Sequence, residues 1–282
     1  MKEDFGIYVT CSKYDIHFAK ASCASIRKHL GNDIPIALIT DGKLKTNSIE
    51  KLYNVQIVCN DLVKDPFINK YCRNSAFTKL VCLWEGPFEK FLHIDADVVI
   101  HGNILKYNLL DKYDFIVDIP SFEYSMEFVN YNMFNTDLIN EYFPEFDAHN
   151  KKYFTAGVFF GTKNKIDIDF FKYLYSLKIK HPNFWKFGDQ GMLNFMLFYL
   201  NQKNKLKLYQ NNEVFQVCVN EYERNYTLKL LNEVKQNSID KPFIVHYCGP
   251  SRPLYKNKKG YSTNLFTFYR LLFLSQNNIP KF

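Results

Sequence analysis

The amino-acid sequence predicts an α/β protein with a largely parallel central sheet and helices on both of its faces. Over the first hundred residues, short apolar runs alternate with segments of helical period. This alternation is typical of strands joined by crossover helices. With 282 residues, 47% of them hydrophobic and 23% charged, the chain has the composition of a folded protein with a full core. The length allows one large domain or two small ones, and we expect a compact protein of enzyme size.

Periodicity places the individual elements. The predicted strands are residues 7–11, 34–40, 55–59 and 91–94. Between the first two strands an apolar stripe predicts a helix that Gly31 ends, formed by Ile16, Ala19, Cys23, Ile26 and Leu30. Similar stripes predict helices over about 75–84, where Lys79 lies off the stripe, and over 193–200 and 265–272.

The segment 121–150 interrupts this regular pattern. It contains six acidic residues and no Lys or Arg, although the whole chain has a net charge of +7. Apart from a short helix expected near 137–142, it shows no clear period. Long irregular segments of compact domains are often lids or binding loops. We expect a lid or a variable substrate-binding loop there.

The rest of the composition limits the cellular setting and the partners. The seven cysteines contain no CxxC pair, which argues against a zinc site or a disulfide framework. An odd cysteine count without a signal peptide predicts a cytoplasmic protein. No apolar run approaches the roughly 18 to 20 residues that span a bilayer, while peripheral contact with a membrane surface stays open. The basic charge suits polyanions such as nucleotide diphosphates, and we expect no nucleic-acid partner.

Two aspartates follow the last strand of the first hundred residues. The apolar residues 91–94 run directly into Asp95, Ala96 and Asp97. In an extended chain, residues i and i+2 point to the same side, so both carboxylates would converge at the carboxyl edge of the sheet, where such folds bind ligands. Convergent carboxylates repel each other unless a cation lies between them, and Mg²⁺ or Mn²⁺ suits oxygen ligands. The alternative is a plain aspartate-containing turn.

Five motifs, in order along nearly the whole chain, resemble those of the glycogenin-like retaining glycosyltransferases. They are FTKL at 77–80, DAD at 95–97, TAGVF at 155–159, GDQG at 188–191, and HYCG at 246–249 with Arg252-Pro253 beyond. The family usually has NSGV at the third motif and HFxG with KP at the last. The combination is far more specific than any single motif.

The resemblance implies a GT-A fold, a Rossmann-like mixed sheet in a single domain over 1–282. A nucleotide-sugar-binding half, 1–105, and an acceptor-binding half, 106–282, would share the sheet. The implied reaction moves a hexose from a UDP-sugar to a glycan, a lipid-linked glycan or another hydroxyl acceptor, with retention of anomeric configuration and with Mn²⁺ or Mg²⁺. A homodimer is left open.

The same resemblance implies a role for each matching residue. The metal ligands would be Asp95, Asp97 and His246, since neutral imidazole can join two carboxylates on Mn²⁺. The catalytic residues would be Asp189, Gln190 and Lys79, with Asp189 under the anomeric carbon. The residues implied for the nucleotide sugar are Thr10, Tyr14, Lys79, Asp95, Ala96, Asp97, Gly249 and Arg252.

Several points stay open at the level of sequence. Retention is compatible with a covalent sugar on an enzyme carboxylate or with front-face substitution. Thr155-Ala156 replaces a polar Asn-Ser pair, which leaves the donor sugar undecided. A catalytically silent binding protein of the same fold is one alternative. A sugar nucleotidyltransferase is another, but the turn after the first strand lacks its glycine-rich phosphate loop.

Overall fold

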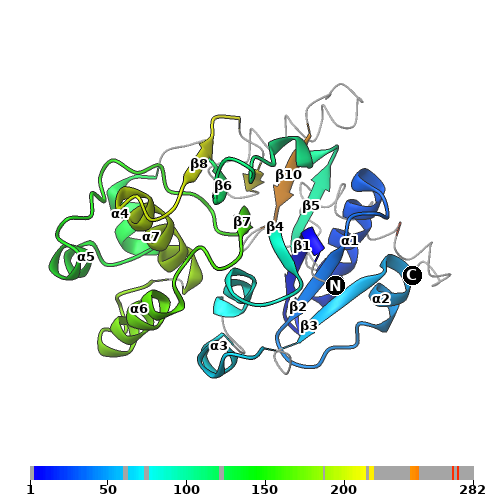
Figure 1. Ribbon diagram of the computed structural model, residues 1–282, viewed down its shortest axis with the longest axis horizontal. Helices are drawn as coiled ribbons and strands as arrows, with labels where there is room; N and C mark the ends of the chain where they lie inside the picture. Colours follow the sequence, from blue (N-terminus) through cyan, green and yellow to red (C-terminus); the bar gives the residue numbers. More distant parts are fainter. Residues whose placement is uncertain are drawn as a thin grey trace, which may run out of the picture.

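A mixed sheet lies at the centre of the computed structural model, which describes residues 3–59, 63–72, 76–120, 124–186, 188–213, 216–218 and 242–247 together with Tyr269 and Leu272. Within these residues the sheet has seven strands (Figure 1). In spatial order they are β3 (Val55–Cys59), β2 (Ile36–Thr40), β1 (Glu3–Cys11), β4 (Phe88–Asp95), β7 (Val158–Thr162), β6 (Phe115–Asp118) and β8 (Leu208–Asn211).

Strand directions confirm the expected mixed sheet. Strand β1 is parallel to β2 and β4, and β2 is parallel to β3, as crossover helices require. Strand β7 is antiparallel to both of its neighbours, β4 and β6. The sheet contains strands from before and after residue 105, while the division of the chain into two functional halves stays a prediction.

A second, three-stranded sheet lies beside the carboxyl end of β4. It consists of β5 (Val98–His101), β10 (Phe243–His246) and β9 (Gln216–Cys218), with β10 in the middle. Strand β5 is antiparallel to β10, and its register places Val98 opposite His246. The small sheet therefore brings a residue from late in the chain to the end of the central strand.

Helices cover both faces of the central sheet, as Figure 1 shows. The helices of the described residues are α1 (Ile16–Leu30), α2 (Asn47–Tyr53), α3 (Pro66–Tyr71), η2 (Ala76–Leu83), η3 (Ile104–Tyr107), α4 (Met126–Asn132), α5 (Thr136–Tyr142), α6 (Ile168–Lys180) and α7 (Asp189–Gln202). Alternate strand residues enter two separate cores: Ile7 and Val9 pack with α1 and β5, whereas Tyr8 packs with η2 and α7. Burial on both sides explains why the strands read as continuous apolar runs.

Predicted helices α1 and α7 are confirmed, but the segment around Lys79 differs from the prediction. Helix α1 ends at Gly31, which has φ of 82°. The apolar stripe at 75–84 predicted a one-sided α-helix, whereas η2 is a 3₁₀ helix in which Thr78 and Cys82 are also buried. It contacts β1, β2, β4 and α7. Packing on several sides, rather than an amphipathic period, defines this segment.

The acidic segment contains more helix than its sequence suggested. The short helix expected near 137–142 is α5, whose N-cap Asn135 accepts hydrogen bonds from Asp137 and Leu138. Helix α4 was not predicted. Its signal is Ser125, whose Oγ accepts a hydrogen bond from the backbone N–H of Phe128, as an N-cap serine does.

Of the helix predicted over 265–272, the structure describes two residues, and both are helical. Tyr269 is buried, and its hydroxyl lies 2.6 Å from Nε2 of His29 on α1. The other residues of that predicted helix lie outside the described part of the chain.

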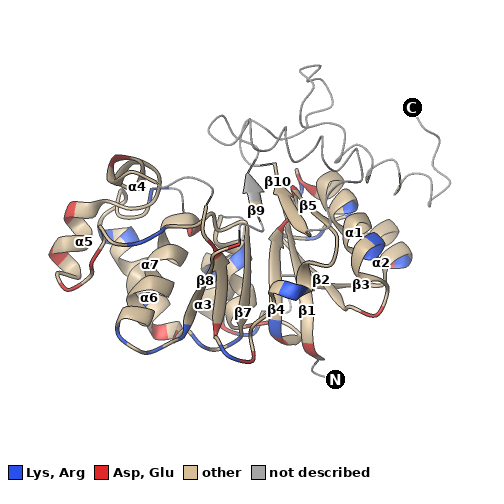
Figure 2. Cartoon of the chain, turned by 90° about the horizontal axis from the view of Figure 1, so that it is seen from above, with Lys and Arg blue, Asp and Glu red and all other residues tan. Residues whose placement is uncertain are grey.

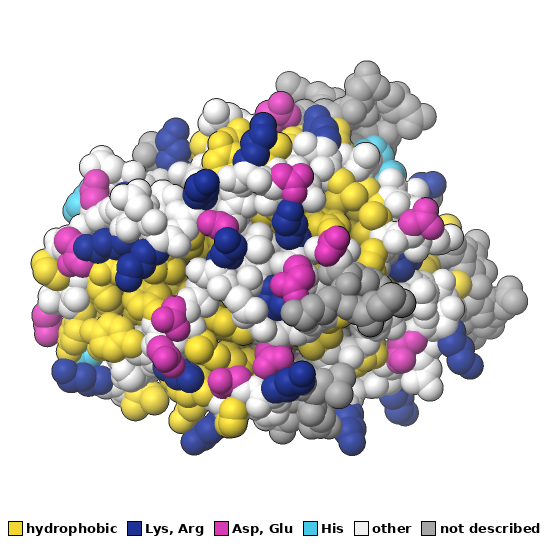
Figure 3. Space-filling view, viewed as in Figure 1, with side chains coloured by type: hydrophobic (Ala, Val, Ile, Leu, Met, Phe, Trp, Pro, Cys, Tyr) yellow, Lys and Arg dark blue, Asp and Glu magenta, His cyan; other side chains and the backbone are white. Residues whose placement is uncertain are grey.

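The described surface carries charges of both signs and some exposed hydrophobic side chains. Lys, Arg, Asp and Glu are interspersed over the helices in Figure 2. On the face in Figure 3, hydrophobic side chains gather at the end that carries α5 and α6, and Tyr173 and Ile179 of α6 are exposed. None of the described helices is long and apolar enough to cross a membrane. Contact with a membrane surface stays a prediction.

Candidate active site

The Asp-Ala-Asp motif forms the link between the two sheets. Asp95 is the last residue of β4, and two turn residues separate it from β5. The Asp95 N–H donates to Gly157 O (2.8 Å), and the Ala96 N–H donates to Thr10 O (3.0 Å). The Asp97 carbonyl accepts from the N–H of Tyr247 (2.9 Å). Backbone bonds to three other segments therefore hold the two aspartates in place.

The two carboxylates converge as predicted, but for a different reason. The prediction placed Asp95 and Asp97 on the same side of one extended strand. In the structure, Ala96 and Asp97 form a turn. The turn aims Asp97 at β10, and the convergence depends on the neighbouring small sheet.

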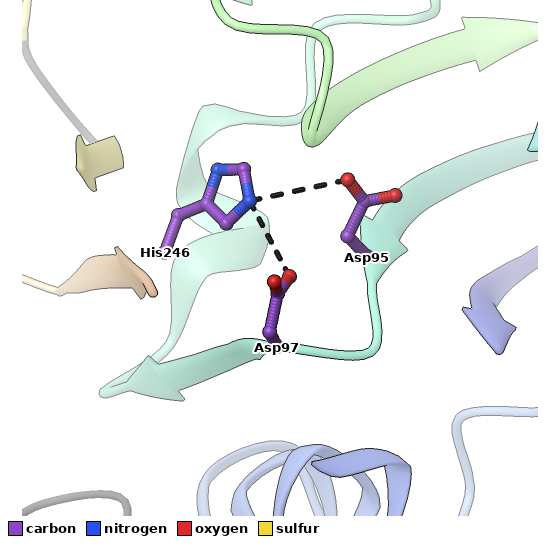
Figure 4. A group of neighbouring side chains, drawn as sticks. All are labelled: Asp95, Asp97 and His246. Atoms are coloured by element: carbon purple, nitrogen blue, oxygen red, sulfur yellow. Dashed lines mark ion pairs between the residues drawn. The ribbon is translucent and has the colours of Figure 1, made fainter. Parts of the chain in front are cut away.

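His246 completes a group of three ligand atoms. Its Nε2 lies 3.4 Å from Oδ1 of Asp97 and 3.9 Å from Oδ2 of Asp95, as Figure 4 shows. All three ligand atoms lie within 4.8 Å of one another. Asp97 and His246 are 2% and 4% exposed. Two oxygens and one imidazole nitrogen in this arrangement fit a divalent cation such as Mn²⁺.

A glycine provides the space for the imidazole ring. A Cβ at Gly157 would lie 2.6 Å from Nδ1 of His246 and closer still to Cε1. Any larger residue would have to displace the ring. The glycine of the TAGVF motif is therefore explained by contact with a residue 89 positions away.

We expect Gly157→Ala to weaken Mn²⁺ binding at least about tenfold, because the added methyl group pushes His246 away from the two carboxylates. Isothermal titration calorimetry with Mn²⁺ measures this. The matched control is Gly161→Ala on β7, the strand that Gly157 directly precedes; a Cβ there would lie 2.8 Å from ring atoms of Phe91 and Phe115. That variant should lose about 1–3 kcal/mol of stability and keep its Mn²⁺ affinity. Equal Mn²⁺ affinity in both variants would contradict the role of Gly157.

Lys79 joins two of the candidate carboxylates. Its Nζ lies 2.8 Å from Oδ2 of Asp95 and 2.9 Å from Oδ2 of Asp189, and its side chain is 12% exposed. Burial lowers the pKa of Lys79, but the two aspartates outweigh burial, and the net pKa is raised. Burial raises the pKa of Asp95, Lys79 opposes this rise, and Asp97 adds to it. A cation between the aspartates would relieve that repulsion.

The GDQG motif forms the N-terminus of α7. Gly188 is the N-cap with φ of 57°, a conformation that favours glycine. The next residue, Asp189, points its carboxylate at Lys79. Both ends of the Gln190 amide bind backbone: Oε1 accepts from the N–H of Ala156 and Nε2 donates to the carbonyl of Phe154, each at 2.7 Å. In this structure Gln190 fixes the TAGVF segment.

Of the remaining predicted residues, the structure describes Thr10, Tyr14 and Ala96. Thr10 and Ala96 line the cleft beside the cluster of candidate metal ligands. Oγ1 of Thr10 lies 2.8 Å from Nε2 of the buried His93. Tyr14 is 73% exposed, and Lys13 Nζ lies 4.9 Å from the centre of its ring. Gly249 and Arg252 lie outside the described residues.

A cleft of about 220 Å³ runs from the cluster to the carboxyl ends of β1 and β2. Its charged lining residues are Asp15, Asp41, Lys79, Asp95, Asp97 and Asp189. The sequence interpretation missed Asp15 and Asp41. Asp41 directly follows the strand at 36–40, and that position at a carboxyl edge was the available signal. Five carboxylates facing one lysine make a lining that favours cations.

The mixed sheet and the ligand group at its central strand define a class of protein, the glycosyltransferases with a GT-A fold. The sequence matches the model of glycosyl transferase family 8 over residues 18–254, and the chain belongs to this family. It is therefore a glycosyltransferase. The family match favours this function over the two alternatives, a silent binding protein of the same fold and a sugar nucleotidyltransferase. No curated protein sequence matches the chain.

Solved structures of glycosyltransferases share the fold. The galactosyltransferase LgtC, crystallised with donor and acceptor sugar analogues, is 17% identical with a TM-score of 0.64, and the match covers 95% of each chain. GlyE of Streptococcus pneumoniae is 14% identical with a TM-score of 0.61, over 99% of this chain and 63% of that one. Mouse xyloside xylosyltransferase 1 is 10% identical with a TM-score of 0.53, over 89% and 100%.

Proposed function

We propose that this enzyme transfers a hexose from a UDP-sugar to a hydroxyl of a glycan or a lipid-linked glycan, with retention of anomeric configuration. Mn²⁺ or Mg²⁺ would be held by Asp95, Asp97 and His246. The observation that carries the proposal is the convergence of these three side chains, two of which, Asp95 and Asp97, line an acidic cleft. A diphosphate is itself anionic, so such a lining can accept one only together with a cation.

The cleft offers separate places for the parts of a nucleotide sugar. The nucleoside would bind at the carboxyl ends of β1 and β2, beside Thr10 and Asp41. The diphosphate would bind at the metal held by Asp95, Asp97 and His246. A bound divalent ion would supply Lewis-acid stabilisation of the leaving diphosphate. Lys79 lies beside this position and would add a second positive charge.

The residues near the sugar support a retaining reaction. Asp189 faces the cleft and is held by Lys79, so its carboxylate is fixed in direction. It would lie under the anomeric carbon and stabilise positive charge as the bond to the diphosphate breaks. The covalent route needs a carboxylate in this place as the nucleophile, whereas in front-face substitution the carboxylate would only stabilise charge.

The acceptor would approach from the part of the chain after residue 105. Tyr124 and Phe128 stack with ring centres 4.5 Å apart, and the Tyr124 hydroxyl lies 3.0 Å from Oγ1 of Thr155. Aromatic faces beside hydroxyl groups suit a sugar ring, which has apolar C–H faces and polar edges. We propose that the acceptor binds on the side of the site that contains Thr155, away from the nucleoside.

The test is a thermal-unfolding screen of nucleotide sugars with and without Mn²⁺. We expect stabilisation by UDP and UDP-sugars in Mn²⁺ only, because a ligand at 100 times its dissociation constant adds about 2.7 kcal/mol. GDP and ADP, tested at equal concentration, should shift the unfolding temperature much less. Sugar transfer or donor hydrolysis should then stop in EDTA and return with added Mn²⁺. Full activity under complete chelation would refute the proposed metal dependence.

A further inference from the structure

A buried glutamine contacts the ring nitrogen of His246 that faces away from the two aspartates. Oε1 of Gln216 lies 3.2 Å from Nδ1 of His246. Gln216 belongs to β9, which pairs with β10, and it is 4% exposed. The contact is therefore a buried hydrogen bond between neighbouring strands of the small sheet.

The surroundings of Gln216 decide which end of its amide faces the histidine. Its Nε2 lies 3.5 Å from Oδ1 of Asp118 and 3.4 Å from the carbonyl of Thr155. A carboxylate and a carbonyl only accept hydrogen bonds, so the NH₂ group belongs on that side. Asp118 Oδ2 also accepts from the backbone N–H of Gln216 at 2.9 Å. The oxygen is thus left to face His246.

An amide oxygen accepts and never donates, so it requires the proton of a neutral His246 to be on Nδ1. The lone pair of the imidazole is then on Nε2, the atom that faces Asp95 and Asp97. A histidine ligates a metal through the nitrogen that has no proton, and the partner of its other nitrogen selects that tautomer.

We propose that Gln216, held by Asp118, is a positioning residue that keeps His246 in the Nδ1–H tautomer and presents Nε2 to the divalent cation. This inference rests on the metal site of the proposed function. The three residues lie on β6, β9 and β10, so the series of hydrogen bonds also links the central sheet to the small sheet. Asp118 is 2% exposed, which keeps water from replacing either bond easily.

The test compares Gln216→Leu and the more flexible Gln216→Met with the unaltered protein. We expect the dissociation constant for Mn²⁺ to rise about 10- to 100-fold, as loss of an outer hydrogen bond to a ligating histidine does elsewhere. In metal-free protein at alkaline pH, ¹⁵N NMR should show His246 as the Nδ1–H tautomer, and both variants should lose that preference. The NMR measurement requires neither metal nor catalysis.

Two further variants separate positioning from general stability. Gln202→Leu is the matched control, because Gln202 also hydrogen-bonds through both ends of its amide, to Glu145 and Asp147, away from the metal group. It should bind Mn²⁺ like the unaltered protein. The double variant Asp118→Asn with Gln216→Glu moves the negative charge from position 118 to position 216 and keeps an acceptor for Nδ1 of His246. It should recover part of the lost affinity, since the carbonyl of Thr155 then faces an acceptor instead of an NH₂ group.

The possible failures are distinguishable. If the unaltered protein binds no Mn²⁺, the proposed metal site fails, and this inference fails with it. If the unaltered protein binds Mn²⁺ and a folded Gln216→Met variant binds it equally tightly, with the His246 tautomer unchanged, only the role of Gln216 is overturned.

Discussion

Replacing Asp97 with asparagine should lower kcat/KM by about three orders of magnitude or more while leaving the fold intact. Asparagine keeps the shape of the side chain but removes the charge that faces Nε2 of His246 at 3.4 Å. A metal ion supplies several kcal/mol of charge stabilisation to the transition state, and each 1.36 kcal/mol is a factor of ten in rate. The measurement is donor hydrolysis or sugar transfer in saturating Mn²⁺, with Mn²⁺ affinity determined in parallel.

The control for Asp97→Asn is Asp111→Asn. Asp111 is also a paired aspartate, 2.5 Å from Nζ of Lys90, but its side chain is 91% exposed. We expect this variant to keep its activity and its Mn²⁺ affinity. Normal turnover in Asp97→Asn, with unchanged dependence on Mn²⁺, would remove Asp97 from the metal site.

Replacing Lys79 with methionine should destabilise the protein by about 3–5 kcal/mol and also remove most of its activity. Methionine fills a similar volume but leaves the carboxylates of Asp95 and Asp189 facing each other without a cation. Breaking a buried ion pair from one side has an effect of this size because the remaining charge stays buried. Urea unfolding, without added metal, gives the change in free energy.

Two comparisons show whether buried charge is the cause. Lys90→Met breaks an exposed pair and should change the free energy of unfolding by about 0–1 kcal/mol. Adding Asp189→Asn to Lys79→Met should restore part of the stability, since it removes one uncompensated charge, but it should not restore turnover. If Lys79→Met unfolds at the same urea concentration as the unaltered protein, the ion pairs at Lys79 do not hold this site together.

The parts of the fold that the sequence predicted well depend on the spacing of apolar residues over short stretches of the chain. Helix α1 follows from five apolar residues at helical spacing and from Gly31 at its end, all within sixteen positions. The strands at β1, β2 and β3 follow from apolar runs between helical segments. Such signals depend on neighbours along the chain, and the central sheet confirms them.

Local sequence patterns predicted the structure incompletely or wrongly at the places where distant segments of the chain meet. The stripe around Lys79 predicted an ordinary amphipathic helix, but η2 is packed on several sides. Gln216 and Asp118 were missed entirely, because each is a single polar residue in a short strand. Their spacing of 98 positions gives no periodic signal. Pairing of β9 with β10 brings Gln216 to His246, and Asp118 contacts Gln216 from β6.

By itself the sequence determined the α/β class of this glycosyltransferase, the order of its first strands and helices, and the candidate residues Asp95, Asp97 and His246. The tertiary structure decided how those residues meet. Asp97 lies on a turn, His246 arrives on a strand 149 residues later, and Gly157 leaves room for its ring. The physical reason is that secondary structure depends mainly on residues that are close along the chain. The candidate metal site depends on strand pairing and burial, which bring together residues that are far apart along the chain.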